Sequence, residues 1–276
     1  MSTSTVDYDS DAPRRPLVTE LRNVIAFRGL IRLMVMRDLT VRYKRSVLGV
    51  WWTILQPLLT SAVMWLVFSQ IFGEGVSEVP FAVYLVSGVL FMTAFAQGVQ
   101  STGSAIVDSR GVLAKVRVPA EVFSFSAAVA ALANFAITLI PLLAIQLIAG
   151  VGIPWTIVLV PIPALALLCA MAGIGMLVAA AAVYFYDVLN LTGVITQLIM
   201  YLTATFYPLE IVPDRFVIFV ELNPMYSYLT TFRAFVYGGT FPELWQFAYM
   251  VGSALFILML GVWAFSRAWR NLVVLL

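Results

Sequence analysis

The sequence has no histidine among its 276 residues and only one cysteine. Without histidine the chain cannot supply an imidazole base, a histidine metal ligand or a Ser-His-Asp triad. The single cysteine, Cys169, cannot form a disulfide within the chain, and we expect it to be a buried packing residue. The histidine-based hydrolase and metalloenzyme sites are therefore excluded.

Lysine is also scarce, occurring only at positions 44 and 115. Neither lysine follows glycines at the spacing of the phosphate-binding motif G-x-x-x-x-G-K-[ST], and no G-x-S-x-G nucleophile motif occurs. The chain therefore cannot bind ATP through a P-loop. We expect no catalytic residue, no metal site and no cofactor in this chain.

Charged residues make up only 11% of the chain, against about 25% in ordinary globular domains, while hydrophobic residues make up 62%. Asp, Glu, Lys and Arg are absent from the windows 46–73, 79–107, 122–186, 188–209 and 244–266. About 20 helical residues cross a bilayer core of about 30 Å. Each window is therefore long enough for at least one crossing.

The window 122–186 is long enough for two crossings, and Gly150, Gly152 and Pro154 mark a turn near its middle. We therefore predict an all-α polytopic membrane protein. Its six predicted transmembrane helices lie near 50–72, 80–104, 121–148, 155–183, 188–206 and 244–266. Carriers coupled to an ion gradient usually have acids inside their spans, so the uncharged spans here favour an external energy source.

The placement of lysine and arginine predicts the orientation, because loops rich in these residues stay in the cytoplasm. Nine of the sixteen precede residue 46, three lie between residues 110 and 117, and two lie at the C-terminal end, whereas only Arg215 and Arg233 fall in the remaining loops. We therefore predict that both termini are cytoplasmic. Residues 1–25 have acids, prolines and no apolar core, which predicts a disordered cytosolic tail before one transmembrane domain at 26–276.

The segment after this tail is basic and partly amphipathic. On a helical wheel Arg28, Arg32, Asp38 and Arg42 fall within one arc, which is typical of a helix lying along an anionic membrane surface. The simpler interpretation is a positive anchor ahead of the first span. The sharper one is an interface helix that also touches a cytosolic partner.

An ordered run of residues within and after this segment resembles a known signature, R-D-L-x-V-R-Y-x-x-S-x-L-G-x-x-W-x-x-x-x-P. It is present here as Arg37, Asp38, Leu39, Val41, Arg42, Tyr43, Ser46, Leu48, Gly49, Trp52 and Pro57. The chain thus resembles the ABC-2 type permeases that export polysaccharides such as O-antigen and teichoic acid. The resemblance implies that Arg28, Arg32, Arg37, Asp38 and Arg42 contact an ATPase subunit.

The loop after the second span resembles the coupling helix of that family. The residues that would form it are Ser109, Arg110, Val112, Leu113 and Lys115. With Val112 and Leu113 on its surface, such a helix could sit in a groove of the ATPase. An ordinary positively charged loop is the alternative.

The segment 207–243 is aromatic, but it is interrupted by prolines and glycines and carries six charges. It is too short and too charged for two further crossings, so we predict two short re-entrant helices, the second capped by Asn223 with Pro224 at its first turn. The family has gate helices here, with an N-P-x(8)-R pattern. The resemblance implies an outer gate that contains Phe216, Phe219, Asn223, Pro224, Tyr226, Phe232 and Arg233. We expect the four aromatic rings to point inward.

The resemblance implies an assembly of two copies of this chain with two copies of an ABC ATPase, which would hold ATP and magnesium. Its substrate would be a polyprenyl-diphosphate-linked glycan of the O-antigen, teichoic acid or galactan type, moved across the bacterial cytoplasmic membrane. Membrane lipid is expected as a partner and nucleic acid is not. The alternatives are an ABC-2 exporter of drugs or lipids and a membrane-embedded glycosyltransferase.

Overall fold

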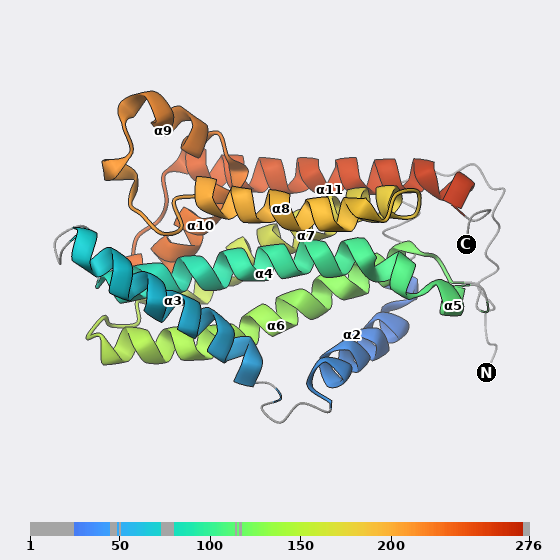
Figure 1. The fold of residues 1–276 in the computed structure, drawn as a ribbon, viewed down its shortest axis with the longest axis horizontal. Coiled ribbons are helices and arrows are strands. Elements are labelled where there is room, and N and C mark those ends of the chain that lie inside the picture. The colour runs from blue at the N-terminus through green and yellow to red at the C-terminus, as the bar shows by residue number, and fades with distance from the viewer. Residues whose placement is uncertain are drawn as a thin grey trace.

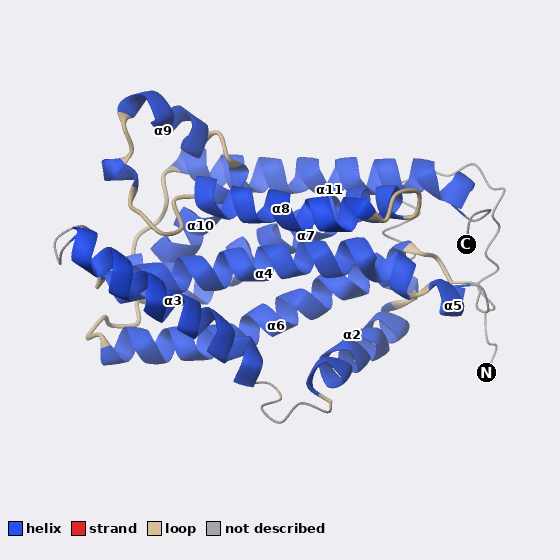
Figure 2. Cartoon of the chain, viewed as in Figure 1, coloured by secondary structure: helices blue, strands red, loops and turns tan. Residues whose placement is uncertain are grey.

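The structure is a computed structural model of the chain and describes residues 25–44, 49, 51–72, 80–113, 115 and 118–272. This described part is built of helices joined by short loops and contains no strand (Figure 2). The all-α prediction is therefore confirmed for these residues. The predicted tail, residues 1–25, lies outside them except for its last position.

Helices occur at every place where the sequence predicts one. The longer helices are α2 (Arg28–Tyr43), α3 (Trp51–Phe72), α4 (Phe81–Asp108), α6 (Glu121–Ile148), α7 (Pro161–Ala182), α8 (Asp187–Leu202) and α11 (Leu244–Leu272). The short elements are α5 (Arg110–Leu113), η1 (Trp155–Leu159), η2 (Leu209–Ile211), α9 (Asp214–Glu221), α10 (Pro224–Arg233) and the π-helical turn η3 (Ala234–Gly238).

Four segments have the length and composition to cross a membrane. They are Phe81–Asp108, Glu121–Ile148, Trp155–Ala182 and Leu244–Ala268. The helix α8 has only 16 residues, and the apolar stretch of α3 runs from Ile54 to Phe68. The protein is thus a multi-helix membrane protein, while the count of six crossings stays a prediction.

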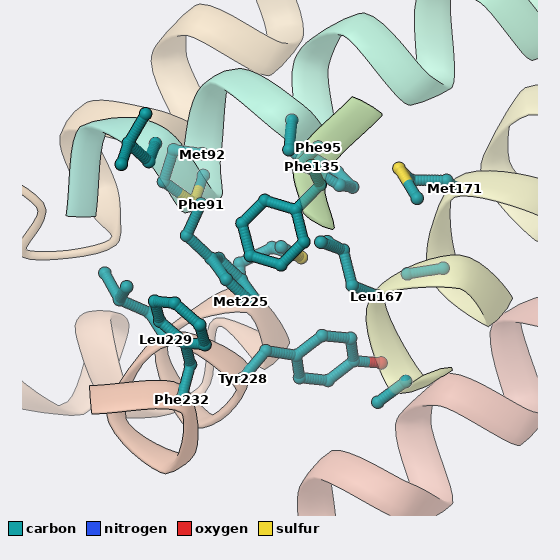
Figure 3. Packing of buried hydrophobic residues seen from close by; sticks show 14 of the residues in the cluster. Phe91, Met92, Phe95, Phe135, Leu167, Met171, Met225, Tyr228, Leu229 and Phe232 are labelled. Carbon is teal, nitrogen blue, oxygen red and sulfur yellow. The ribbon is translucent and has the colours of Figure 1, made fainter. Parts of the chain in front are cut away.

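Of these four segments, α4 has the most deeply buried apolar stretch, and it packs against α3, α6, α7 and α8. Its side chains form the main core with α6, α7, α10 and α11. Three rings meet there, with centroids 5.7 Å apart for Phe91 and Phe135, 5.0 Å for Phe91 and Phe232, and 5.6 Å for Phe135 and Phe232 (Figure 3). This cluster ties the short helix α10 to the long helices.

Small residues let the long helices approach closely. A Cβ atom on Gly261 of α11 would lie 2.1 Å from the carbonyl oxygen of Gly173 in α7. In the same way, a Cβ atom on Gly173 would lie 2.4 Å from the carbonyl oxygen of Ile257 in α11. Glycine is the only residue that fits at either position without a shift of backbone. Close packing of this kind is common between membrane helices.

The bundle has two distinct ends (Figure 1). At one end, here called the α5 end, lie α5, the first turns of α2 and the last turns of α11. At the other, here called the α9 end, lie α9, α10 and the turn between α6 and η1, where Gly150 has a φ of +76°. The predicted turn at 150–154 is therefore confirmed.

Candidate functional site

The predicted interface helix is α2, and it lies against the α5 end of the bundle. Its buried side chains Ile31 and Met34 pack against residues of α6, α7 and α11, including Phe123 and Phe265. Its opposite face is exposed, with Leu33 at 69% and with the basic side chains of Arg28 and Arg32. One face of α2 is thus fixed to the bundle and the other is free in the single chain.

The charged residues of the signature lie further along α2. The Arg37 guanidinium donates two hydrogen bonds to Asp38 Oδ1, from Nε at 3.0 Å and from Nη2 at 2.8 Å. Both side chains are partly exposed, so the pair adds little to stability. It places a positive and a negative group side by side on the surface of α2. Arg42 belongs to the same helix, but its side chain lies outside the described part of the structure.

The predicted coupling helix is the single turn α5. Ser109 precedes it and is buried, and its carbonyl oxygen accepts from the amides of Val112 and Leu113, both at 2.9 Å. Arg110, Val112 and Lys115 are exposed, with Val112 at 44%. Leu113 is half-buried against the core instead of lying free on the surface as expected.

A cavity of about 510 Å³ lies between α2, α4, α5 and α6. The polar side chains that line it are Arg37, Asp38, Ser101, Ser104, Asp108 and Ser109. Met34 from α2, Val112 from α5 and Phe123 from α6 add apolar surface. The predicted interface helix and the predicted coupling helix therefore form two walls of one cavity.

The two predicted short helices exist at the α9 end, as α9 and α10. The prediction for the start of α10 is confirmed, because Asn223 is the N-cap residue, its side chain accepts from the amide of Met225 at 3.1 Å, and Pro224 follows at the first position. The side-chain Nδ2 of Asn223 also donates to Thr203 Oγ1 at 2.9 Å. Tyr226 and Phe232 are buried, as expected.

The prediction that all four gate rings point inward is wrong for α9. Phe216 is 48% exposed and Phe219 is 64% exposed in the single chain. The reason is that α9 packs mainly against α10 and projects from the bundle (Figure 1). A single hydrogen bond, from the hydroxyl of Tyr249 to the carbonyl of Leu222 at 2.6 Å, ties its end to α11.

Arg233, the last residue of α10, is only 6% exposed. Its guanidinium donates to the carbonyl oxygens of Tyr84 and Thr205, both at 3.1 Å, and lies 3.6 Å from the centre of the Tyr84 ring. Longer contacts of 3.4 Å reach Ser87 Oγ and the carbonyl of Ala204. This arginine therefore connects α10 with α4 and with the segment after α8.

Sequence reasoning assigned Arg233 to the gate but missed the residues that surround it. Gly88 leaves the space for the guanidinium, since a Cβ there would lie 2.6 Å from Arg233 Nη2. Gln146 and Thr156 hold the π-helical turn after α10, donating to the carbonyls of Val236 at 3.1 Å and Phe235 at 2.9 Å. The one signal in the sequence was an arginine in an apolar stretch without a nearby acid.

Residues 29–237 match the family described as ABC-2 type transporter. The chain is 31% identical over 229 residues to the O-antigen export system permease protein RfbA of Myxococcus xanthus, covering 82% of this chain and 87% of that protein.

Two further relatives are more distant. One is the O-antigen export system permease protein RfbA of Klebsiella pneumoniae, 22% identical over 236 residues, covering 84% of this chain and 90% of that protein. The other is the capsule polysaccharide export inner-membrane protein CtrC of Neisseria meningitidis, 23% identical over 252 residues, covering 90% and 94%. The family match, residues 29–237, includes α2 from its second residue on, the cavity walls and α10.

Proposed function

This chain belongs to the ABC-2 type transporter family, and from that membership we propose that it is the transmembrane permease of an ABC exporter for a lipid-linked polysaccharide. The observation that carries the proposal is the similarity, along most of the chain, to permeases named for O-antigen and capsule polysaccharide export. A polyprenyl-diphosphate-linked glycan of the O-antigen, teichoic acid or galactan type is the proposed substrate.

A separate ATPase subunit drives export in this proposal, because the sequence has no P-loop. ATP and magnesium belong to that subunit. It binds at the α5 end, where Arg28 and Arg32 of α2 and Arg110 of α5 are exposed and where Val112 of α5 lines the cavity. A displacement of α5 by the ATPase then reaches α4 directly, since only Ser109 separates the two helices.

Two copies of the chain enclose the path of the glycan. The core of one copy is filled by side chains where α4, α6 and α10 meet, with the rings of Phe91, Phe135 and Phe232 in contact (Figure 3). Two helices, α3 and α8, have large exposed apolar side chains, such as Trp65 at 47% and Leu198 at 56%. These faces supply the contact between the copies and the wall of the path.

In the bacterial cytoplasmic membrane the α5 end faces the cytoplasm, and both termini lie there. Six helices cross, because α3 and α8 join the four long apolar segments. The helices α9 and α10 are re-entrant on the outer side and form the gate. The charge of the loops supports this orientation, because all but two of the lysines and arginines belong to the N-terminal segment, the loop after the second span or the C-terminal end.

The test is export by the reconstituted transporter. The chain and its ATPase are placed in proteoliposomes that contain a polyprenyl-diphosphate-linked glycan, and movement of the glycan to the far leaflet is followed with a lectin. We expect movement that requires ATP and both subunits, and no ATP hydrolysis by the purified chain alone. Movement of a drug or phospholipid without movement of the glycan would contradict the proposal.

A further inference from the structure

The end of α8 poses a hydrogen-bonding problem. The helix ends at Leu202, and the next six residues, 203–208, are not helical. Thr203, Ala204 and Thr205 are at most 1% exposed, and Ala204 has a φ of +51°. The last carbonyls of a helix have no partner within it, and an unsatisfied carbonyl is costly in apolar surroundings. This buried segment therefore needs donors from side chains.

Residues of the segment itself satisfy the last turn of α8. The Thr203 hydroxyl donates to the carbonyl of Ile199 at 2.6 Å, and the Thr205 hydroxyl donates to that of Met200 at 2.8 Å. The Tyr207 hydroxyl donates to the carbonyl of Tyr201 at 2.9 Å. The carbonyls of the segment itself still need donors from other elements.

Tyr84 of α4 and Arg233 of α10 supply those donors. The Tyr84 hydroxyl lies 2.9 Å from the carbonyl oxygen of Ala204 and 2.8 Å from that of Tyr207. The Arg233 guanidinium donates to the backbone carbonyl oxygens of Ala204 and Thr205 in the segment and to that of Tyr84 on α4. Two elements that are far from Arg233 in sequence therefore meet at its guanidinium: the segment after α8, 28 and 29 residues away, and α4, 149 residues away.

No described carboxylate forms an ion pair with Arg233. Its charge is stabilised instead by the carbonyl oxygens beyond the C-terminal end of α8 and by the face of the Tyr84 ring. In many ion-coupled transporters the carbonyl end of an interrupted helix binds a free cation. Here the cation is a side chain, held in the space that Gly88 leaves open.

We propose that Arg233 is a positioning residue for export. It joins α4, the segment after α8 and α10 into one unit, and so sets the position of the outer end through which the glycan leaves. This inference rests on the proposed function. It separates the two outer helices: α10 is part of the fixed unit, whereas α9, with few contacts, is the part that can move.

The experiment uses the complete transporter in proteoliposomes with Arg233→Gln, Arg233→Lys and, as a matched control, Arg267→Gln, an exposed arginine of α11 that also lies near an aromatic ring, that of Trp263. Glutamine removes the charge and the fork of donors, so we expect export to fall about tenfold or more while ATP hydrolysis stays within about twofold. Lysine keeps the charge and should give an intermediate rate. Arg267→Gln should export like the unmodified transporter.

Two results would overturn the inference. The first is normal export per ATP in Arg233→Gln. The second is loss of membrane insertion or of ATPase binding in both Arg233 variants, which would assign the residue to folding alone.

A thiol measurement tests the same contact without any substrate. Ser87→Cys, in a chain with Cys169→Ala, places a buried thiol beside the guanidinium. We expect a small methanethiosulfonate to label it slowly when Arg233 is present and about tenfold faster in Arg233→Gln. Equal rates would contradict the positioning role, whereas absence of glycan export by the unmodified transporter would contradict only the proposed function.

Discussion

Two glycines, at positions 173 and 261, set the distance between α7 and α11, because the backbone of one helix occupies the place of a side chain on the other. Their role differs from that of Gly252, an exposed glycine of α11 whose added Cβ would meet nothing within 4 Å. Alanine in place of Gly261 should therefore affect stability differently from alanine in place of Gly252, although both belong to α11.

We predict that Gly261→Ala lowers the free energy of unfolding by about 1–3 kcal/mol, as overpacking does elsewhere. Gly252→Ala should leave stability unchanged or raise it by up to about 1 kcal/mol, because alanine favours a helix over glycine. Thermal unfolding of the two variants in mild detergent makes the comparison. A Gly261→Ala chain as stable as the parent would contradict the close contact.

The helix α10 has only 10 residues, so its position and stability depend on contacts with the rest of the chain. Asn223 serves it twice, by accepting from Met225 N and by donating to Thr203 Oγ1. Its remaining stability comes from burial against α4, α7 and α11. The cap therefore fixes where the helix begins, and the core fixes where it lies.

Replacing Asn223 by alanine should lower the free energy of unfolding by about 1–2 kcal/mol, since both the cap and the bond to Thr203 are lost. Asn223→Ser keeps an acceptor for the cap and should recover part of the difference. Chemical unfolding of both variants measures the effect. Equal loss in the two would mean that capping contributes nothing.

The single turn α5 has a different character, since its exposed surface is small and its proposed function depends on a partner. We predict that Val112→Asp lowers export about tenfold while the ATPase still hydrolyses ATP, because a buried charge in a docking surface is costly. Val112→Thr, which has nearly the same shape, should have a much smaller effect. Unchanged export in Val112→Asp would mean that this turn is an ordinary loop.

The helices could be predicted from the sequence because their boundaries have local causes. Windows without charge located the long helices, and Asn223 with Pro224 located the start of α10. The surroundings of Arg233 could not be predicted, because Tyr84 and Ser87 lie 149 and 146 residues away. The exposure of Phe216 and Phe219 was missed for a related reason: an apolar ring predicts burial, but not whether the neighbour is the same chain.

For the molecule as a whole, the proposed topology makes a direct prediction. Asp214, Arg215 and Glu221 are the first two residues and the last residue of the exposed helix α9. Burying such groups at mid-bilayer costs roughly 2.5–3.5 kcal/mol for each Asp or Arg, against a few tenths gained per apolar residue. These charges should therefore stay at the outer surface.

Cysteines at positions 214 and 221, in a chain with Cys169→Ala, should both react with an impermeant thiol reagent added outside the cell. Val112→Cys in the same background should react only when the inner face is opened. Labelling of either α9 cysteine from the cytoplasm alone would overturn the topology from α8 onward.

The helix α4 has a mechanical consequence that follows from its length and its neighbours. It is 28 residues long, with Ser101 and Ser104 beside the cavity near one end and Tyr84, Ser87 and Gly88 around Arg233 near the other. A straight helix of this length is a rod of about 42 Å. Tilting such a rod by about 3° around its middle would displace its two ends by about 1 Å in opposite directions. A small push at α5 would thus arrive at the Arg233 unit as a lateral movement, with no need for any helix to unfold.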